Sequence, residues 1–279
     1  MKTNSCLDAP IAEGRHPVVV FTHGHTGTFT DYTFIFEDLA SRGYVVASVD
    51  HTYEATAVEF PDGRIVRSVL GSHWDNTLRT DEQSSSFAVS VRVGDLRFVV
   101  DELGRLNADP SGPFGGKLDP ARVAIAGHSL GGMTALPALL QDPRFKAGVL
   151  IDGWPDTLTT PTETPVLILA AGHEQWTEGE RALWNNLRGP RLAVNLRGAE
   201  HLTPSDLVWR AKDGIKTGAM GTDKTIAAIR SYIATFLDTY LRGRPMTPLL
   251  SGPSSEYPDA VVTTGRQPLR DEAVDHPQP

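Results

Sequence analysis

The sequence predicts an α/β fold in which a mostly parallel β-sheet carries helices on both faces. Short apolar runs alternate along the chain with segments of helical periodicity, which is the pattern of a parallel sheet with crossover helices. The apolar runs are rich in β-branched residues and nearly continuous, as in strands that are buried on both faces. With 279 residues, one such domain can account for the chain.

The expected strands share short length and apolar composition, and they lie at 18–21, 44–49, 123–126, 147–151, 166–171 and 192–196. The expected helices carry apolar residues three and four positions apart, and they lie at 31–41, 86–106, 130–140 and 222–241. We expect a single domain over residues 1–263. Within it, residues 52–83 show no sustained period and are expected to form a lid or to line a pocket. The polar, proline-rich segment 264–279 is expected to be a poorly ordered tail.

Composition argues against several classes of partner and leaves two compartments open. The formal net charge of −8 disfavours nucleic acid, and a chain whose one cysteine is Cys6 forms no disulfide within itself. No apolar run reaches the roughly 18–20 residues of a membrane span, so integral membrane association is not expected. Residues 1–5 are polar and lack the apolar core of a signal peptide. We therefore expect a cytoplasmic protein, or a secreted one whose signal peptide is absent from this sequence.

A G-x-S-x-G pattern at residues 127–131 follows the strand expected at 123–126 without a break. In this pattern the serine lies on a sharp turn between a strand and a helix, and its hydroxyl is exposed. Glycines flank it because the turn is strained and larger side chains would collide with the strand or the helix. A helix is expected to begin at Leu130, so the context favours Ser129 as the nucleophile of an α/β-hydrolase fold over an ordinary serine in a glycine-rich turn.

The segment that follows the first expected strand supplies a candidate oxyanion hole. Strand 18–21 leads into His23-Gly24-His25, where this fold often carries an H-G motif. The predicted donors are the backbone N–H groups of His25 and Leu130. A competing interpretation makes His23 and His25 metal ligands, but no cysteine or acidic cluster nearby completes such a site. We therefore expect neither a metal nor a cofactor.

Position in the chain selects the base. The fold places the triad in the order serine, acid, histidine, with the histidine on a loop after the last strand. His201 follows strand 192–196 by a few residues and fits that place. His173 comes too early in the order, and His276 lies in the expected tail. His128, inside the elbow, is interpreted as a packing residue at the border of the pocket.

Position in the chain does not decide which residue is the acid of the triad. Asp152 ends the strand expected at 147–151, and Glu174 follows the strand expected at 166–171. Both strand ends are used for the acid within this fold. The two residues are therefore equal candidates until a further observation separates them.

Several segments resemble the bacterial relatives of the plasma type of platelet-activating factor acetylhydrolase, over about residues 8–240. The segments that carry the resemblance are 8–10, 17–24, 39–47, 49–51, 127–132, 144–148, Asp152-Gly153-Trp154 and 196–201. In that family the acid is the aspartate just before a small residue and a tryptophan, which implies Asp152 here. The chain departs from the family in two ways. Only about sixteen residues precede the first strand, so we expect either that the sheet lacks the first N-terminal strands or that the start of this sequence is truncated. His25 also stands where the animal enzymes carry an apolar residue, which bears on the shape of the acyl pocket.

The residues and the resemblance together predict a serine esterase that hydrolyses short-acyl carboxylic esters through an acyl-serine intermediate. Its expected substrate is a small ester or a short-acyl phospholipid. His25, Trp154 and His128 are the side chains expected to border the pocket. The alternatives are a cutinase or polyester-type hydrolase, a broad-scope lipase, a peptidase, and a non-enzymatic binding protein on the same fold.

Overall fold

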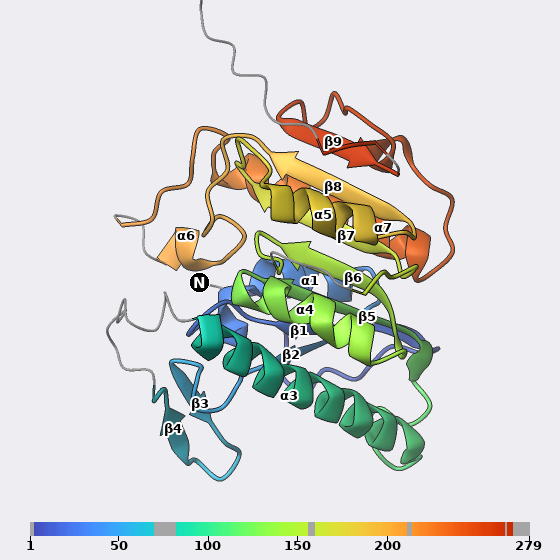
Figure 1. Cartoon of the computed structure of the whole chain (residues 1–279). Helices are drawn as coiled ribbons and strands as arrows, with labels where there is room; N and C mark the ends of the chain where they lie inside the picture. Colours follow the sequence, from blue (N-terminus) through green and yellow to red (C-terminus); the bar gives the residue numbers. More distant parts are fainter. Residues whose placement is uncertain (1–2, 70–81, 156–159, 211–213, 266, 270–279) are drawn as a thin grey trace, which may run out of the picture.

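A seven-stranded sheet organises the chain, whose computed structural model describes residues 3–69, 82–155, 160–210, 214–265 and 267–269 (Figure 1). Its first six strands run parallel and the last is antiparallel. The spatial order is β2 (Val45–Val49), β1 (His16–Thr22), β5 (Leu118–His128), β6 (Phe145–Ile151), β7 (Val166–Ala171), β8 (Arg191–Leu196) and β9 (Ala260–Thr264). A separate hairpin pairs β3 (Ala57–Glu59) with β4 (Ile65–Arg67).

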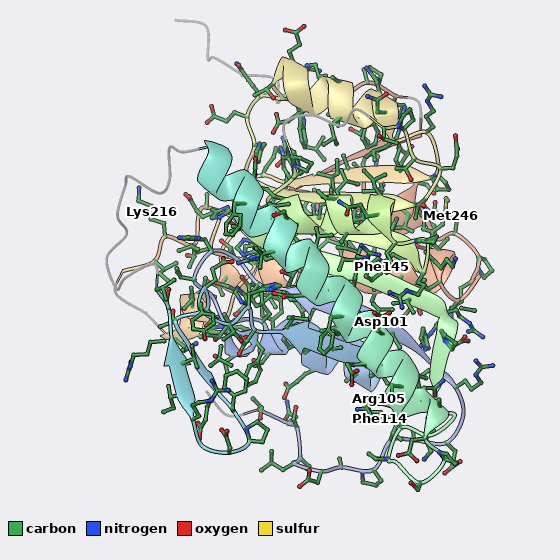
Figure 2. The ribbon with its side chains drawn as sticks, turned by 60° about the horizontal axis from the view of Figure 1, so that its bottom comes forward. Asp101, Arg105, Phe114, Phe145, Lys216 and Met246 are labelled. Carbon is green, nitrogen blue, oxygen red and sulfur yellow. The ribbon has the colours of Figure 1, made fainter. Side chains whose placement is uncertain are left out.

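Helices cover both faces of the sheet. One face carries α1 (Thr33–Ser41) and α7 (Thr222–Tyr240), and the other carries α3 (Glu82–Ala108), α4 (Leu130–Gln141) and α5 (Glu178–Asn186). Figure 2 shows the long α3 crossing its face of the sheet, with Asp101 and Arg105 in its C-terminal half. The short elements are η1 (Phe29–Asp31), α6 (Leu207–Arg210) and η2 (Pro248–Leu250).

The two-residue period of the strands divides the core into two layers. In β1, Val18 and Val20 face the helices α3 and α4, whereas Val19 and Phe21 face α1 and α7. All four side chains are buried. Burial of one such side chain contributes about 1.5–3 kcal/mol relative to leaving it in water, so a strand that is apolar on both faces is stable only between two helical layers.

The observed fold is the predicted α/β-hydrolase class, and each expected strand and helix is present within a few residues of its expected bounds. The described residues 3–15 form no strand ahead of β1. The sequence did not indicate α5, β9 or the β3–β4 hairpin, which lies inside the excursion expected at 52–83. Residues 70–81 of that excursion lie outside the described part of the chain.

The segment 264–279, expected to be a poorly ordered tail, is described at residues 264–265 and 267–269. β9 pairs with the free edge of β8 and ends at Thr264. Beyond it, the Gln267 carbonyl accepts a hydrogen bond from the Trp184 indole at 2.8 Å, and Leu269 is buried against the same layer. An edge strand offers unpaired backbone groups that a polar segment can satisfy, which composition does not reveal. Residue 266 and residues 270–279 lie outside the described part.

Among the described helices, none combines the length and the apolar composition that crossing a lipid bilayer would require.

The elbow generates a prediction about two helical glycines. A Cβ added at Gly132 in α4 would stand 2.1 Å from the Gly153 carbonyl oxygen, whereas one added at Gly104 in α3 would meet nothing within 4 Å. We expect Gly132→Ala to lower the free energy of unfolding by about 1–3 kcal/mol or more, because backbone must move. The matched control Gly104→Ala should raise it by about 0.5–1 kcal/mol, because alanine favours a helix. Urea denaturation measures both, and an unchanged midpoint for Gly132→Ala would show that the elbow is loosely packed.

Candidate active site

Ser129 lies on a strained turn between β5 and α4. Its backbone has φ 56° and ψ −122°, in the region that residues other than glycine rarely adopt. Close backbone packing enforces this conformation: a Cβ at Gly131 would stand 2.1 Å from the Thr22 carbonyl oxygen, and one at Gly153 would stand 2.0 Å from the Ser129 carbonyl oxygen. The Ser129 N–H also donates to the Ile151 carbonyl at 2.9 Å. The turn therefore presses against the ends of β1 and β6 on both sides.

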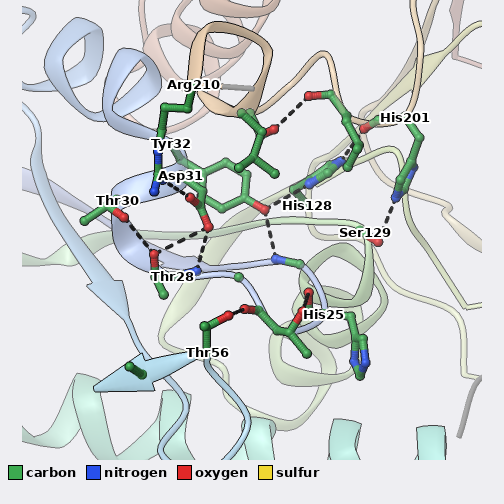
Figure 3. Close-up of a pocket in the computed structure, with 17 residues that line it drawn as sticks. His25, Thr28, Thr30, Asp31, Tyr32, Thr56, His128, Ser129, His201 and Arg210 are labelled. Carbon is green, nitrogen blue, oxygen red and sulfur yellow. Dashed lines mark hydrogen bonds and ion pairs between the residues drawn. The ribbon is translucent and has the colours of Figure 1, made fainter. Parts of the chain in front are cut away.

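A chain of hydrogen bonds joins Ser129, His201 and Asp152. The Ser129 Oγ and His201 Nε2 atoms are 2.9 Å apart, and His201 Nδ1 lies 2.5 Å from Asp152 Oδ2. These residues come from three places along the carboxyl edge of the sheet, after β5, β8 and β6. The His201 side chain is 51% exposed whereas that of Asp152 is 5% exposed. The pair therefore combines a solvent-accessible imidazole with a buried carboxylate. Figure 3 shows the His201 imidazole beside the hydroxyl of Ser129.

Asp152 is held in its ionised form by hydrogen bonds. Burial by itself would raise its pKa, but donors from His173, His201 and the Ala171 N–H outweigh burial and hold the pKa of Asp152 well below its usual range. The Ala171 N–H donates to Oδ1 at 2.8 Å, and His173 Nε2 lies 3.3 Å from the same oxygen. Both oxygens of the carboxylate are therefore occupied, and Oδ2 is left to His201.

The two candidates for the acid occupy different environments. Asp152 contacts His201, while Glu174 is exposed to solvent on the loop after β7. His173, the earlier rival for the base, contacts the acid rather than the serine. His276 lies outside the described residues.

The predicted oxyanion donors flank Ser129. Leu130 is the first residue of α4, so its N–H has no acceptor inside the helix. The loop that carries His25 abuts the nucleophile, since a Cβ built on Gly24 would stand 3.4 Å from the Ser129 Cβ. The His25 side chain lies 3.9 Å from Glu54 of the excursion. Both segments therefore border the place where an oxyanion would form at Ser129.

A buried arginine contacts the backbone of the loop that carries His25. No pattern in the sequence indicated this role. Arg92 of α3 is fully buried, and its guanidinium donates to the His23 carbonyl at 2.6 Å and to the Gly24 carbonyl at 3.2 Å. It also forms an ion pair with Glu54. Burial, and next the charge of Arg92, lower the pKa of His23 well below its usual value. A neutral His23 and a satisfied arginine hold the loop backbone in place.

His128 connects the three segments of the site. The Gly24 N–H donates to the Tyr32 hydroxyl at 2.9 Å, and that hydroxyl lies 3.0 Å from His128 Nδ1. His128 Nε2 lies 2.8 Å from the His201 carbonyl oxygen. Burial, helped by the nearby His201, lowers the pKa of His128 to about 4, so the ring is neutral at neutral pH. Because the carbonyl only accepts, Nε2 carries the proton and Nδ1 accepts from Tyr32.

A cavity of about 460 Å³ opens beside Ser129 and His201 (Figure 3). His25 and His128 line it, and so do Tyr32, Ala57, Leu202 and Leu207. Asp31 and Arg210 also line it and form an ion pair, with Arg210 Nη1 2.6 Å from Asp31 Oδ1. The hairpin strand β3 contributes to the wall, so this part of the excursion borders the pocket.

Trp154, a side chain expected to border the pocket, is not part of the lining of this cavity. Trp154 is buried in the core layer of α3, α4 and α5, and its indole N–H donates to Glu180 at 2.9 Å. An indole that can bury its ring and also reach a carboxylate partner is stable inside the protein.

In the part of the chain that the structure describes, His, Cys, Asp and Glu side chains form no group of three that could hold a metal ion. Both ring nitrogens of His23 have protein partners: Nδ1 contacts the Gly24 carbonyl and Nε2 accepts from the His51 N–H. His23 therefore contributes to the hydrogen-bond network of the backbone at this loop.

Three comparisons place the chain among known proteins. The family model of platelet-activating factor acetylhydrolase, isoform II, matches residues 1–69 and 107–213. A probable 1-alkyl-2-acetylglycerophosphocholine esterase from Arthroderma benhamiae is 25% identical over 271 residues, which cover 88% of this chain and 65% of that protein. Platelet-activating factor acetylhydrolase from Cavia porcellus is 32% identical over 174 residues, which cover 55% of this chain and 39% of that protein.

A solved structure agrees. The ferulic acid esterase from Streptomyces cinnamoneus is 34% identical, with a TM-score of 0.74 over 91% of this chain and 74% of that one. The chain thus spans less than two thirds of the length of the two relatives from Arthroderma and Cavia. The family model covers more than half of the present chain, and its matched residues include the elbow at 127–131, Asp152 and His201. The resemblance noted in the sequence is confirmed, and the chain belongs to the platelet-activating factor acetylhydrolase isoform II family.

Proposed function

We propose that this protein is a carboxylic ester hydrolase that forms an acyl intermediate on Ser129. The observation that carries the proposal is the hydrogen-bonded series Ser129 Oγ, His201 and Asp152 beside a 460 Å³ cavity. A serine becomes a nucleophile when an adjacent base accepts its proton and a third group orients that base. The family membership supports the same reaction, since the relatives named above are esterases.

The reaction proceeds in two acyl-transfer steps. His201 Nε2 accepts the Ser129 proton as Oγ attacks the ester carbonyl, and Asp152 stabilises the imidazolium that forms. The N–H groups of His25 and Leu130 donate to the oxyanion, and each such donor is worth about 3–4 kcal/mol in comparable enzymes. The imidazolium then returns its proton to the leaving alcohol. Water activated by the same imidazole hydrolyses the acyl-serine and restores Ser129.

The substrate class we propose is a short-acyl ester with a larger alcohol. The names of two relatives state an acetyl ester of a glycerophosphocholine and an acetylhydrolase activity. The cavity wall is consistent with a limit on acyl length, because it combines Tyr32, Leu202 and Leu207 with the Arg210–Asp31 ion pair. Apolar walls bind the first few methylenes favourably, whereas an ion pair in the wall is costly to desolvate.

Ser129→Ala tests the nucleophile. We expect ester hydrolysis to fall by a factor of about 10⁴ or more, because no other group can form the acyl intermediate. The melting temperature should change little, since the hydroxyl points at His201 rather than into the core. Turnover of a p-nitrophenyl ester and a thermal melt measure both, with the exposed Ser251→Ala as control. Turnover that survives in Ser129→Ala would overturn the assignment.

A pair of isosteric amides separates the two candidate acids. Asp152→Asn should lower kcat by about 10⁴, because an amide cannot stabilise the imidazolium and favours the wrong tautomer of His201. Glu174→Gln should retain most of the activity, because Glu174 is exposed and Asp152 accepts the bond from His201. The opposite ranking of kcat would assign the acid to Glu174 instead.

A series of p-nitrophenyl esters from acetyl to long acyl chains tests the substrate class. kcat/KM should hold over the first few carbons, gaining up to about 0.8 kcal/mol per buried methylene, and should fall once the chain meets the wall. Leu207→Ala should shift the preference toward longer chains, since Leu207 lines the cavity. Trp154→Ala, outside that lining, should lower stability and leave the preference unchanged. A steady rise in kcat/KM to long chains would indicate a lipase, and release of soluble acids from a polyester film would favour the cutinase-type alternative.

A further inference from the structure

A second histidine contacts the carboxylate of Asp152, on the side opposite His201. His173 Nε2 lies 3.3 Å from Asp152 Oδ1, while His201 Nδ1 lies 2.5 Å from Oδ2. An ionised carboxylate only accepts hydrogen bonds, so His173 Nε2 carries a proton and donates. The reaction as proposed above uses one of these two histidines and leaves the other without a role.

The surroundings of His173 hold its ring in one orientation. Its backbone N–H donates to Asn195 Oδ1 at 3.0 Å, and its carbonyl accepts from Asn195 Nδ2 at 2.5 Å, so one side chain of β8 fixes both ends of the residue. The imidazole lies against two indoles, with its centroid 5.0 Å from that of Trp154 and 5.5 Å from that of Trp176. A ring packed in this way has little freedom to leave the carboxylate.

The charged groups that face His173 come from three elements. Asp152, on the loop after β6, is in contact with the His173 ring. Glu180 of α5 binds the indole N–H of Trp154 and acts on His173 at longer range. His201, on the loop after β8, lies on the far side of the shared carboxylate. The contact with Asp152 raises the pKa of His173 despite partial burial, so its cation persists to higher pH than that of a free histidine.

We propose that His173 is a positioning residue for the acid, and that a proton gained by His173 weakens the support that Asp152 gives to the reaction. This inference rests on the proposed function of Ser129, His201 and Asp152. The hydrogen bond to Oδ1 turns the carboxylate so that Oδ2 faces the base. When His173 gains a proton, its positive charge opposes the positive charge that forms on His201 during the reaction, across the carboxylate that both rings contact.

The direction of the pH effect follows from these charges. Above the titration of His173, the ring is neutral and Asp152 supports the imidazolium of the transition state fully. Below it, the cation weakens that support and lowers the rate. The fall of kcat/KM toward acidic pH should therefore include a step due to His173 besides the loss of the base, with a shoulder between them.

Two variants separate the charge from the hydrogen bond. His173→Gln keeps an N–H donor without a charge, and His173→Phe keeps a packed ring without either. We expect His173→Gln to lose the shoulder, with kcat on the alkaline plateau within about threefold of wild type. His173→Phe should show the same single step, with kcat lowered about tenfold and KM unchanged, because Asp152 is less well oriented.

The experiment measures kcat and KM for a p-nitrophenyl ester against pH in the wild type, the two variants and the control His16→Gln. His16 begins β1 at the opposite end of the sheet and should leave the profile unchanged. Profiles of His173→Gln and wild type that superimpose would overturn the inference. If a variant does not fold, a single-step acid limb in the wild type overturns it equally. The Ser129→Ala variant distinguishes failure of this inference from failure of the proposed function. Hydrolysis that survives in Ser129→Ala would refute the proposed function itself.

Discussion

Backbone contact at glycine positions is the constraint on which the rest of this site depends. A Cβ at Gly127, Gly131, Gly132 or Gly153 would stand between 2.0 and 2.3 Å from a carbonyl oxygen of a neighbouring segment. Side chains cannot occupy that space, so the elbow, the end of β1 and the loop after β6 approach at backbone distance. The positive φ of Ser129 is stable because these contacts surround it. This packing brings the nucleophile to the edge of the sheet where the other functional segments end.

Neutral histidines join the segments that carry the polar groups. His128 links the loop after β1, through Tyr32, to the backbone of the His201 loop. Its pKa of about 4 leaves the ring uncharged at neutral pH. His51 contacts Thr22 and Asp95 beneath the same loop, and burial lowers its pKa as well. A neutral imidazole with one donor and one acceptor can bridge two partners without the desolvation cost of a charge. The network therefore orders the site while the charge stays on Asp152 and on the ion pairs.

Buried charges occur here where several partners satisfy them. Arg92 has no exposed surface, and its guanidinium donates hydrogen bonds to carbonyl groups of the loop after β1 and pairs with Glu54. Asp152 receives donors on both oxygens. Removing one partner from such a group leaves an uncompensated charge, which is far more costly than losing a surface ion pair. This explains why α3 and the loop after β7, neither of which carries the nucleophile or the base, are coupled to the site.

The sequence by itself determined the fold class, the nucleophile turn and the place of His201, because these depend on local patterns. Strand and helix periods differ, glycines mark the elbow, and the order of elements fixes which loop follows the last parallel strand. It left the acid open between Asp152 and Glu174, and only the family resemblance favoured Asp152. The tertiary structure decided which carboxylate faces His201, that Trp154 belongs to the core, and that His173, Tyr32 and Arg92 contact the site. It also placed β9 on the edge of β8. These contacts join residues far apart in the chain, and no spacing or composition records which side chains meet when parallel strands end at one edge of a sheet.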